Sequence, residues 1–133
     1  MQSDDVKKDR KYTKDHEWAR RDGEAVKVGI TAFAVDQLGD ITLVNIDAKV
    51  GDVLTAGKAF GTIESVKTLS DLFAPVSGKV TAINAALESA PELINEDCYE
   101  KGWMIELAPS DLGEAASLLE PDAYAEFLKT AAH

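Results

Sequence analysis

Short apolar runs separated by turn-forming residues fill the middle of this chain, and they constrain its fold more than any other feature. Each run between residues 39 and 107 is only a few residues long and is rich in strand-forming side chains. Such spacing is typical of an antiparallel β sandwich or barrel, because a turn reverses the chain after every few residues. The runs are ITLVNI, KAFGTIE, TLSDLFA, GKVTAI and GWMIELA, and the turns contain Gly51, Gly57, Pro75 and Gly78.

The segment before this β region contains signals for a hairpin and a short helix. Asp22-Gly23 stands between two strand-like stretches, and this dipeptide favours a two-residue hairpin turn. Thr31 is a residue type that caps helices, and Gly39 is a residue type that ends them. We therefore expect a β hairpin followed by a short helix near residues 31–38.

The C-terminal region, residues 110–131, has the apolar periodicity of helices rather than of strands. Apolar side chains recur there at helical spacing in two stretches, and Pro121 suits the first turn of the second helix. A further helical turn is expected at PELI, where Pro91 suits the first helical position. The two apolar stripes are Leu112, Ala115, Ala116 and Leu119, and then Tyr124, Phe127, Leu128 and Ala131.

Length and composition favour one domain without a membrane segment. The chain has 133 residues and a formal net charge of −10, from 14 Lys and Arg against 24 Asp and Glu. The length suits a single domain over residues 12–133, and the polar segment 1–11 is expected to be flexible. The acidic balance disfavours nucleic acid and anionic membranes as partners. No apolar run approaches the ~20 residues that span a bilayer.

Cysteine content and the N-terminal sequence favour the cytoplasm. Cys98 is the only cysteine, so the chain cannot form an internal disulfide, and a reducing compartment suits it. The first residues, MQSDDVKKDRK, have neither the apolar stretch of a secretory signal nor the acid-poor composition of a transit peptide. The cytoplasm is the expected location, and the mitochondrial matrix is the alternative if a transit peptide has been removed.

Catalytic and metal-binding motifs are incomplete in this sequence. His16-Glu17 begins like the helix motif of zinc proteases, but Arg20 occupies the position of the required second histidine. Lys58 and Lys79 each follow a glycine, yet neither has the earlier glycine or the following Ser or Thr of a phosphate-binding loop. We therefore expect a protein that is not a conventional enzyme and that holds no metal.

Residues 57–80 form the most informative stretch. Two strand-like runs flank Ser65-Val66-Lys67-Thr68, so Lys67 is expected at the tip of a β hairpin. A lysine at such a tip projects its amine into solvent from a rigid support, where a modifying enzyme can reach it. Judged from the hairpin alone, an ordinary solvated lysine in a turn is the alternative.

The sequence around this lysine resembles the lipoyl-attachment segment of the glycine cleavage system H-protein family. That resemblance begins with ESVKTLSD followed by APVSGKV, and it extends in the family's order and spacing over roughly residues 11–130. The further segments are KYTKDHEWAR, VGITAFAVDQLGDI, AFGTIESVK, LINED and GWMIELAPS. One departure is Cys98, which stands where the family usually has proline. The resemblance implies a barrel-sandwich hybrid, the lipoyl-domain fold, with peripheral helices.

The resemblance also implies a non-catalytic carrier whose lipoic acid is covalently attached to Lys67. In that family the arm takes a methylamine group from glycine at glycine decarboxylase (P-protein) and delivers it to aminomethyltransferase (T-protein). Dihydrolipoyl dehydrogenase (L-protein) then reoxidises the dithiol, and a lipoate ligase or an octanoyl or lipoyl transferase attaches the cofactor. A monomer is expected. The matching positions are Glu64 and Gly78 for recognition by the lipoylating enzyme, and Glu17, Asp71 and Asp15 for a cleft that shields the loaded arm.

Three alternatives remain open from the sequence. An H-like protein that mainly donates lipoyl groups to other enzymes would need the same lysine and hairpin. A biotinyl carrier shares the hairpin, but that family has Met on both sides of its lysine, whereas Val66 and Thr68 flank Lys67 here. An unmodified structural domain is the third.

Overall fold

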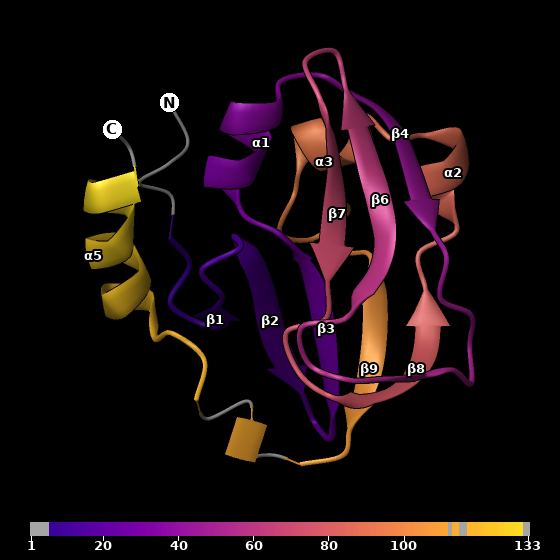
Figure 1. Ribbon diagram of the computed structural model, residues 1–133, viewed down its shortest axis with the longest axis vertical. Coiled ribbons are helices and arrows are strands. Elements are labelled where there is room, and N and C mark those ends of the chain that lie inside the picture. The colour runs from indigo at the N-terminus through magenta and orange to yellow at the C-terminus, as the bar shows by residue number, and fades with distance from the viewer. Residues whose placement is uncertain (1–5, 112, 115–116, 132–133) are drawn as a thin grey trace.

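Two antiparallel sheets form the body of the protein, as the sequence predicts. The computed structural model describes residues 6–111, 113–114 and 117–131, and Figure 1 shows the sheets with the helices at their periphery. One sheet has the order β1 (Lys11–Tyr12), β2 (Glu17–Asp22), β3 (Ala25–Ile30), β9 (Ile105–Pro109), β8 (Gly78–Ile83) and β5 (Val53–Leu54). The other has the order β4 (Ile41–Ile46), β6 (Ala59–Ser65) and β7 (Leu69–Phe73). The predicted mainly β fold is confirmed.

The core is a single apolar cluster to which both sheets contribute. Alternate residues of the strands point inward, as the two-residue period of a strand requires. Buried side chains of the larger sheet include Trp18, Val28 and Leu107, and those of the smaller sheet include Ile63 and Leu72. Within the described residues, no helix is long and apolar enough to cross a membrane.

The hairpin and helix predicted near the N-terminus are both present. β2 and β3 pair in register up to Asp22 and Ala25, so the two-residue turn consists of Gly23 and Glu24 and lies one residue later than the predicted Asp22-Gly23. Of that dipeptide only Gly23 has a positive φ, of +66°, while Asp22 remains in the strand. The helix α1 (Ala32–Leu38) begins after Thr31, whose side-chain oxygen accepts a hydrogen bond from the Ala34 N–H. Local residue preferences therefore favour these elements, and distant contacts add to them, since the Ala32 N–H donates to the Tyr99 hydroxyl.

The helical turn predicted at PELI begins later than expected. Pro91 lies in a turn between two short helices, α2 (Ala86–Ser89) and α3 (Leu93–Glu96), and Glu92 precedes the second helix as its cap. The chain ends α2 at Ala90, where the backbone leaves the helical region with φ −138°. Because Pro91 follows this break directly, it belongs to the connecting turn and not to the helix.

The second of the two predicted C-terminal helices is confirmed. The helix α5 (Pro121–Ala131) begins at the predicted proline and buries Tyr124 and Leu128. Of the first apolar stripe, Leu112, Ala115 and Ala116 lie outside the described residues, and Leu119 forms a β bridge with Tyr12.

Order at the N-terminus extends into the segment that we expected to be flexible. Arg10 is only 5% exposed, and its Nη1 donates a hydrogen bond of 2.8 Å to the Tyr99 carbonyl oxygen. The guanidinium lies 4.7 Å from the centre of the Trp18 ring and pairs with the carboxylates of Asp9 and Glu100. The folded unit therefore includes Arg10, two residues before the predicted start at Tyr12.

Substitution of Arg10 by alanine is expected to lower the free energy of unfolding by about 2 kcal/mol. The change removes the charged donor to the Tyr99 carbonyl and exposes the face of Trp18. The carboxylates of Asp9 and Glu100 are more than half exposed, so they return to water at little cost. Urea unfolding measures the effect.

Lys8→Ala is the matched control, because the Lys8–Asp122 pair lies almost entirely in solvent. Such a pair contributes at most about 1 kcal/mol to stability. Equal losses in the two variants would contradict the role given to Arg10.

Candidate functional site

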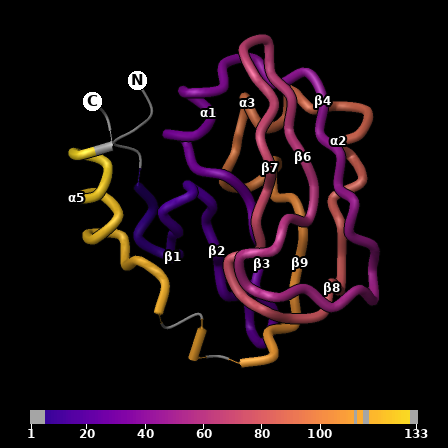
Figure 2. The backbone as a smooth tube through the Cα atoms, in the orientation of Figure 1, coloured from indigo at the N-terminus to yellow at the C-terminus, as the bar shows by residue number. Residues whose placement is uncertain are grey.

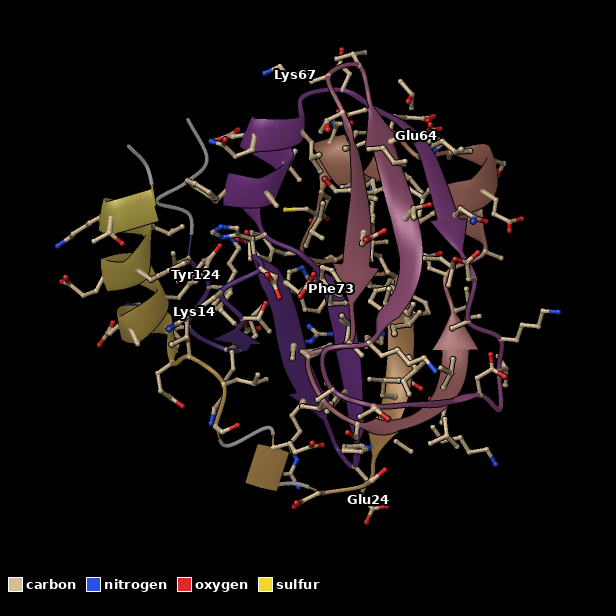
Figure 3. The ribbon with its side chains drawn as sticks, in the orientation of Figure 1. Lys14, Glu24, Glu64, Lys67, Phe73 and Tyr124 are labelled. Carbon is tan, nitrogen blue, oxygen red and sulfur yellow. The ribbon has the colours of Figure 1, made fainter. Side chains whose placement is uncertain are left out.

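Lys67 lies at the tip of the hairpin formed by β6 and β7, as predicted (Figure 3). The two strands pair as far as Glu64 and Leu69, and the Ser65 N–H then donates to the Thr68 carbonyl at 2.8 Å. The Ser65 hydroxyl oxygen accepts from the backbone N–H groups of Lys67 at 3.1 Å and Thr68 at 3.2 Å. A serine in this position stabilises a tight turn. The lysine side chain is left exposed.

The connection between α1 and β4 supports the tip from one side. Figure 2 traces this connection past the end of the hairpin, and the Val66 N–H donates to the Asp40 carbonyl at 3.1 Å. A Cβ atom added to Gly39 would lie 3.5 Å from Cε of Lys67 and 3.6 Å from Cγ2 of Val66. Gly39 also has φ +78°, which other residues rarely adopt. The stem of Lys67 therefore rests beside a backbone segment that bears no side chain.

Asn95 in α3 fastens the supporting connection. Its Nδ2 donates to the Gly39 carbonyl at 3.0 Å, and its Oδ1 accepts from the Ile41 N–H at 2.9 Å. Asn95 was not among the predicted site residues. Its only signal was its place in the LINED segment, because its hydrogen-bond partners lie more than fifty residues earlier in the chain.

Glu17, the first residue of β2, has an ionisable side chain that is buried. It is 2% exposed, and its Oε2 accepts from the Phe73 N–H at 3.2 Å while its Oε1 accepts from the Thr13 hydroxyl at 3.0 Å. Burial raises the pKa of this carboxyl to about 8, against the two hydrogen bonds, which lower it, and the nearby Asp15 charge adds to the rise. The carboxyl therefore binds its proton far more tightly than an ordinary glutamate does.

Asp71 and Asp15 are exposed, in contrast to Glu17. Asp71 pairs with Thr62 across β6 and β7, two residues before Phe73, whose N–H binds Glu17. Asp15 precedes Glu17 by two residues. The structure thus brings Glu17 to the same strand as Asp71, but no hydrogen bond joins these acids within the described residues.

His16, between Asp15 and Glu17 in the sequence, packs against α1 and α5. Its Nδ1 lies 2.9 Å from the hydroxyl of Tyr124, which in turn lies 2.7 Å from the hydroxyl of Thr31. Its ring centre lies 4.5 Å from that of Phe33, and burial lowers its pKa, against the opposing charge of Asp15. In the part of the chain that the structure describes, no cluster of His, Cys, Asp or Glu has the arrangement of a metal site.

Glu64 lies close to Lys67, whereas Gly78 does not. Glu64 is partly buried in β6, opposite Leu69 of β7. Gly78 begins β8, five residues after the base of the hairpin at Phe73, so it lies at the opposite end from the tip. A Cβ atom on Gly78 would lie 2.5 Å from the Ala108 carbonyl oxygen. Close packing against β9 therefore accounts for this glycine.

A cavity of about 740 Å³ lies behind the supporting connection, between α1, α3 and residues 7–10. Gly39, Asp40 and Asn95 contribute to its wall, as does the buried Cys98. None of the three acids that the resemblance assigns to the arm cleft lines this cavity. The cavity and those acids are therefore separate features of the molecule.

Gly78→Ala is expected to lower the free energy of unfolding by about 1–3 kcal/mol, because the new methyl group overlaps backbone atoms of β9 that cannot easily move. Lys79→Ala is the matched control on the next residue, which is exposed, and it should change stability by no more than about 0.5 kcal/mol. Urea unfolding compares the two. Equal stability of both variants would contradict the packing role of Gly78.

Glu17→Gln is expected to reduce the dependence of stability on pH. Because its pKa is raised in the folded state, the contribution of Glu17 to wild-type stability is largest below about pH 4.5 and falls as the pH rises toward about 8. The loss is on the order of 5 kcal/mol, at about 1.4 kcal/mol per pKa unit. The glutamine side chain does not ionise, and its amide can still accept from Phe73 and donate to Thr13.

Urea unfolding at several pH values across this range measures the difference. Glu24→Gln, at an exposed hairpin turn, should retain the wild-type slope. An unchanged slope in Glu17→Gln would refute the ionisation of a buried carboxyl as its cause.

Comparison with known proteins gives a consistent result. Residues 10–131 match the family described as glycine cleavage H-protein. A glycine cleavage system H protein of Anaeromyxobacter sp. (strain K) is 50% identical over 125 residues, which is 94% of this chain and 97% of the relative. One from Thermus thermophilus is 48% identical over 128 residues, 96% of this chain and 99% of the relative.

A solved structure agrees with these sequence relatives. The crystal structure of a glycine cleavage system H protein from Mycobacterium marinum has a TM-score of 0.83 and 36% sequence identity, and the match covers 96% of this chain and 100% of that one. The family predicted from the segments around Lys67 is therefore confirmed. The chain belongs to the glycine cleavage H-protein family.

Proposed function

We propose that the protein carries lipoate in amide linkage on Lys67 and uses this arm to serve the enzymes of glycine cleavage in turn. As a member of its family, it is a lipoyl carrier of the glycine cleavage system and not a catalyst. The assignment to Lys67 rests on one observation: this lysine is exposed at a hairpin tip whose backbone is held by hydrogen bonds. The Lys67 N–H donates to the Ser65 hydroxyl oxygen, and the Val66 N–H donates to the Asp40 carbonyl.

The surroundings of Lys67 fit an acylated lysine. Its amine forms no salt bridge among the described residues, while the Lys67 and Val66 backbone N–H groups hold the turn. When the amine attacks the carbonyl of an activated acyl donor, a C–N bond forms, the bond to the leaving group breaks, and a proton passes to solvent. The product amide has no charge. Because the amine forms no salt bridge among the described residues, acylation breaks no ion pair there.

Lipoate, once attached, supplies a dithiolane that can accept electrons and bear an amine-containing group. We assign to Glu17, Asp71 and Asp15 the binding of that cationic amine. The hydrogen bond of Glu17 to Phe73 supports this assignment, because it holds a carboxyl beside β7, the strand that leads away from Lys67. A cation that approaches Glu17 would favour its ionised form and lower its raised pKa.

The remaining assignments follow the family. Glu64 lies three residues before Lys67. We propose that a lipoate ligase or an octanoyl or lipoyl transferase recognises it. The same role for Gly78 rests on the resemblance alone, since packing already accounts for this residue. The proposed partners are glycine decarboxylase, aminomethyltransferase and dihydrolipoyl dehydrogenase. The bacterial relatives support a cytoplasmic location, and a monomer is proposed from the carrier role alone.

Lys67→Arg is expected to abolish lipoylation, because the guanidinium keeps the positive charge but is not acylated. Each protein is produced with a lipoate ligase and lipoate, and its intact mass is measured. The wild type should gain the mass of one lipoyl group, and the variant should gain none.

Lys79→Arg, on the exposed face of β8, is the matched control and should be lipoylated like the wild type. Two results would refute the attachment site. One is an unmodified wild type, and the other is a lipoyl group retained by Lys67→Arg.

A further inference from the structure

Large apolar side chains that remain exposed gather around the tip of the β6–β7 hairpin. The described residues include five such side chains, and three of them lie there: Leu43, Val66 and Leu69. Leu43 is 45% exposed and Leu69 is 60% exposed. Single exposed apolar residues are ordinary on protein surfaces, but a group of them marks an interaction site.

The pairing of the strands places two of these residues in one row with Glu64. Leu43 of β4 lies opposite Glu64 of β6, which lies opposite Leu69 of β7. Residues that are direct partners across an antiparallel sheet point to the same face. The neighbouring partners Val44 and Ile63 point into the core, so this row faces solvent. We call Leu43, Glu64 and Leu69 the leucine row.

A hollow of about 430 Å³ lies over the leucine row, and its charged side chains are both acidic. Glu64 and Glu88 contribute to its wall, together with the two leucines and polar or apolar neighbours, and no basic residue lines it. Neither carboxylate forms a salt bridge among the described residues. A partner that fits this surface must therefore bring a basic side chain flanked by apolar ones.

We propose that the leucine row, with Val66 beside it, is the surface on which the enzyme that acylates Lys67 docks. Glu64 and Leu69 form the last strand pair before the turn, so the row adjoins the lysine (Figure 3). The unmodified side chain is short, and an enzyme that acylates it must close around the hairpin tip. Enzymes that act on the dithiolane reach it through the lipoyl arm and can remain farther away. The inference rests on the proposed function of Lys67.

The test uses the unmodified full-length protein as substrate for a purified bacterial lipoate ligase, with lipoate and ATP to form the activated acyl adenylate. Intact mass follows the rate of modification. Leu43→Ser and Leu69→Ser should each lower kcat/KM about fivefold, mainly through KM, because each removes apolar contact area at the interface. Val53→Ser is the matched control, since Val53 is 70% exposed on β5, outside the leucine row. It should remain within about twofold of the wild type.

The acidic side of the hollow has its own variant. Glu88→Gln should lower kcat/KM about threefold at low ionic strength and less at high salt, because salt screens an exposed charge pair. An effect that is independent of salt would contradict the proposed basic side chain of the partner.

Two further measurements identify the occupant of the surface. Fully lipoylated Leu43→Ser and Leu69→Ser should be reduced by dihydrolipoyl dehydrogenase and NADH at the wild-type rate, and a loss equal to that in lipoylation would overturn the assignment. Sedimentation of the wild type should show a monomer. A dimer that Leu69→Ser dissociates would instead make a second copy of the chain the occupant.

The failure of this inference differs from the failure of the proposed function. If the wild type is lipoylated at Lys67 but both serine variants react like Val53→Ser, only the docking surface is refuted. If the wild type accepts no lipoyl group at all, the proposed modification itself is refuted.

Discussion

The hydrogen bond from the Val66 N–H to the Asp40 carbonyl joins the lysine tip to the rest of the molecule. Without it the β6–β7 hairpin would end in a turn secured only by Ser65. The Asp40 carbonyl is itself held in place, because Asn95 binds the residues on either side of it. Gly39 completes the arrangement by presenting no side chain to the lysine. A chain of polar contacts thus runs from α3 through the α1–β4 connection to the proposed attachment site.

Features that depend on neighbouring residues were predictable from the sequence. The β2–β3 hairpin, although its turn lies one residue later than predicted, and the Thr31 cap each depend on a few adjacent positions, and so does the hairpin that presents Lys67. The start of α5 at Pro121 belongs to the same group. In each case the residue type itself favours one local backbone geometry, so no knowledge of distant segments was needed.

Features that depend on distant contacts were not predictable in the same way. From the sequence, Arg10 was predicted to belong to a flexible polar segment. It is buried because Trp18 and Tyr99 come together around it. Leu43 and Leu69 are exposed because of the face of the sheet toward which each side chain points. For Leu43 this face also depends on the bulge in β4 between Ile41 and Leu43, which shifts the register of pairing with β6. The family resemblance identified Glu17, but only the fold shows that this acid is buried against Phe73.

Among the described residues, the Lys67 amine forms no salt bridge. This has a consequence for the order in which the chain folds and is acylated. None of the hydrogen bonds described for the turn uses the amine: they use backbone N–H groups and the side chains of Ser65 and Thr68. Folding therefore draws no ion-pair stability from the Lys67 amine, and acylation removes none. The polypeptide can therefore fold completely before the cofactor is attached, and maturation then consists of adding the lipoyl arm to a folded protein.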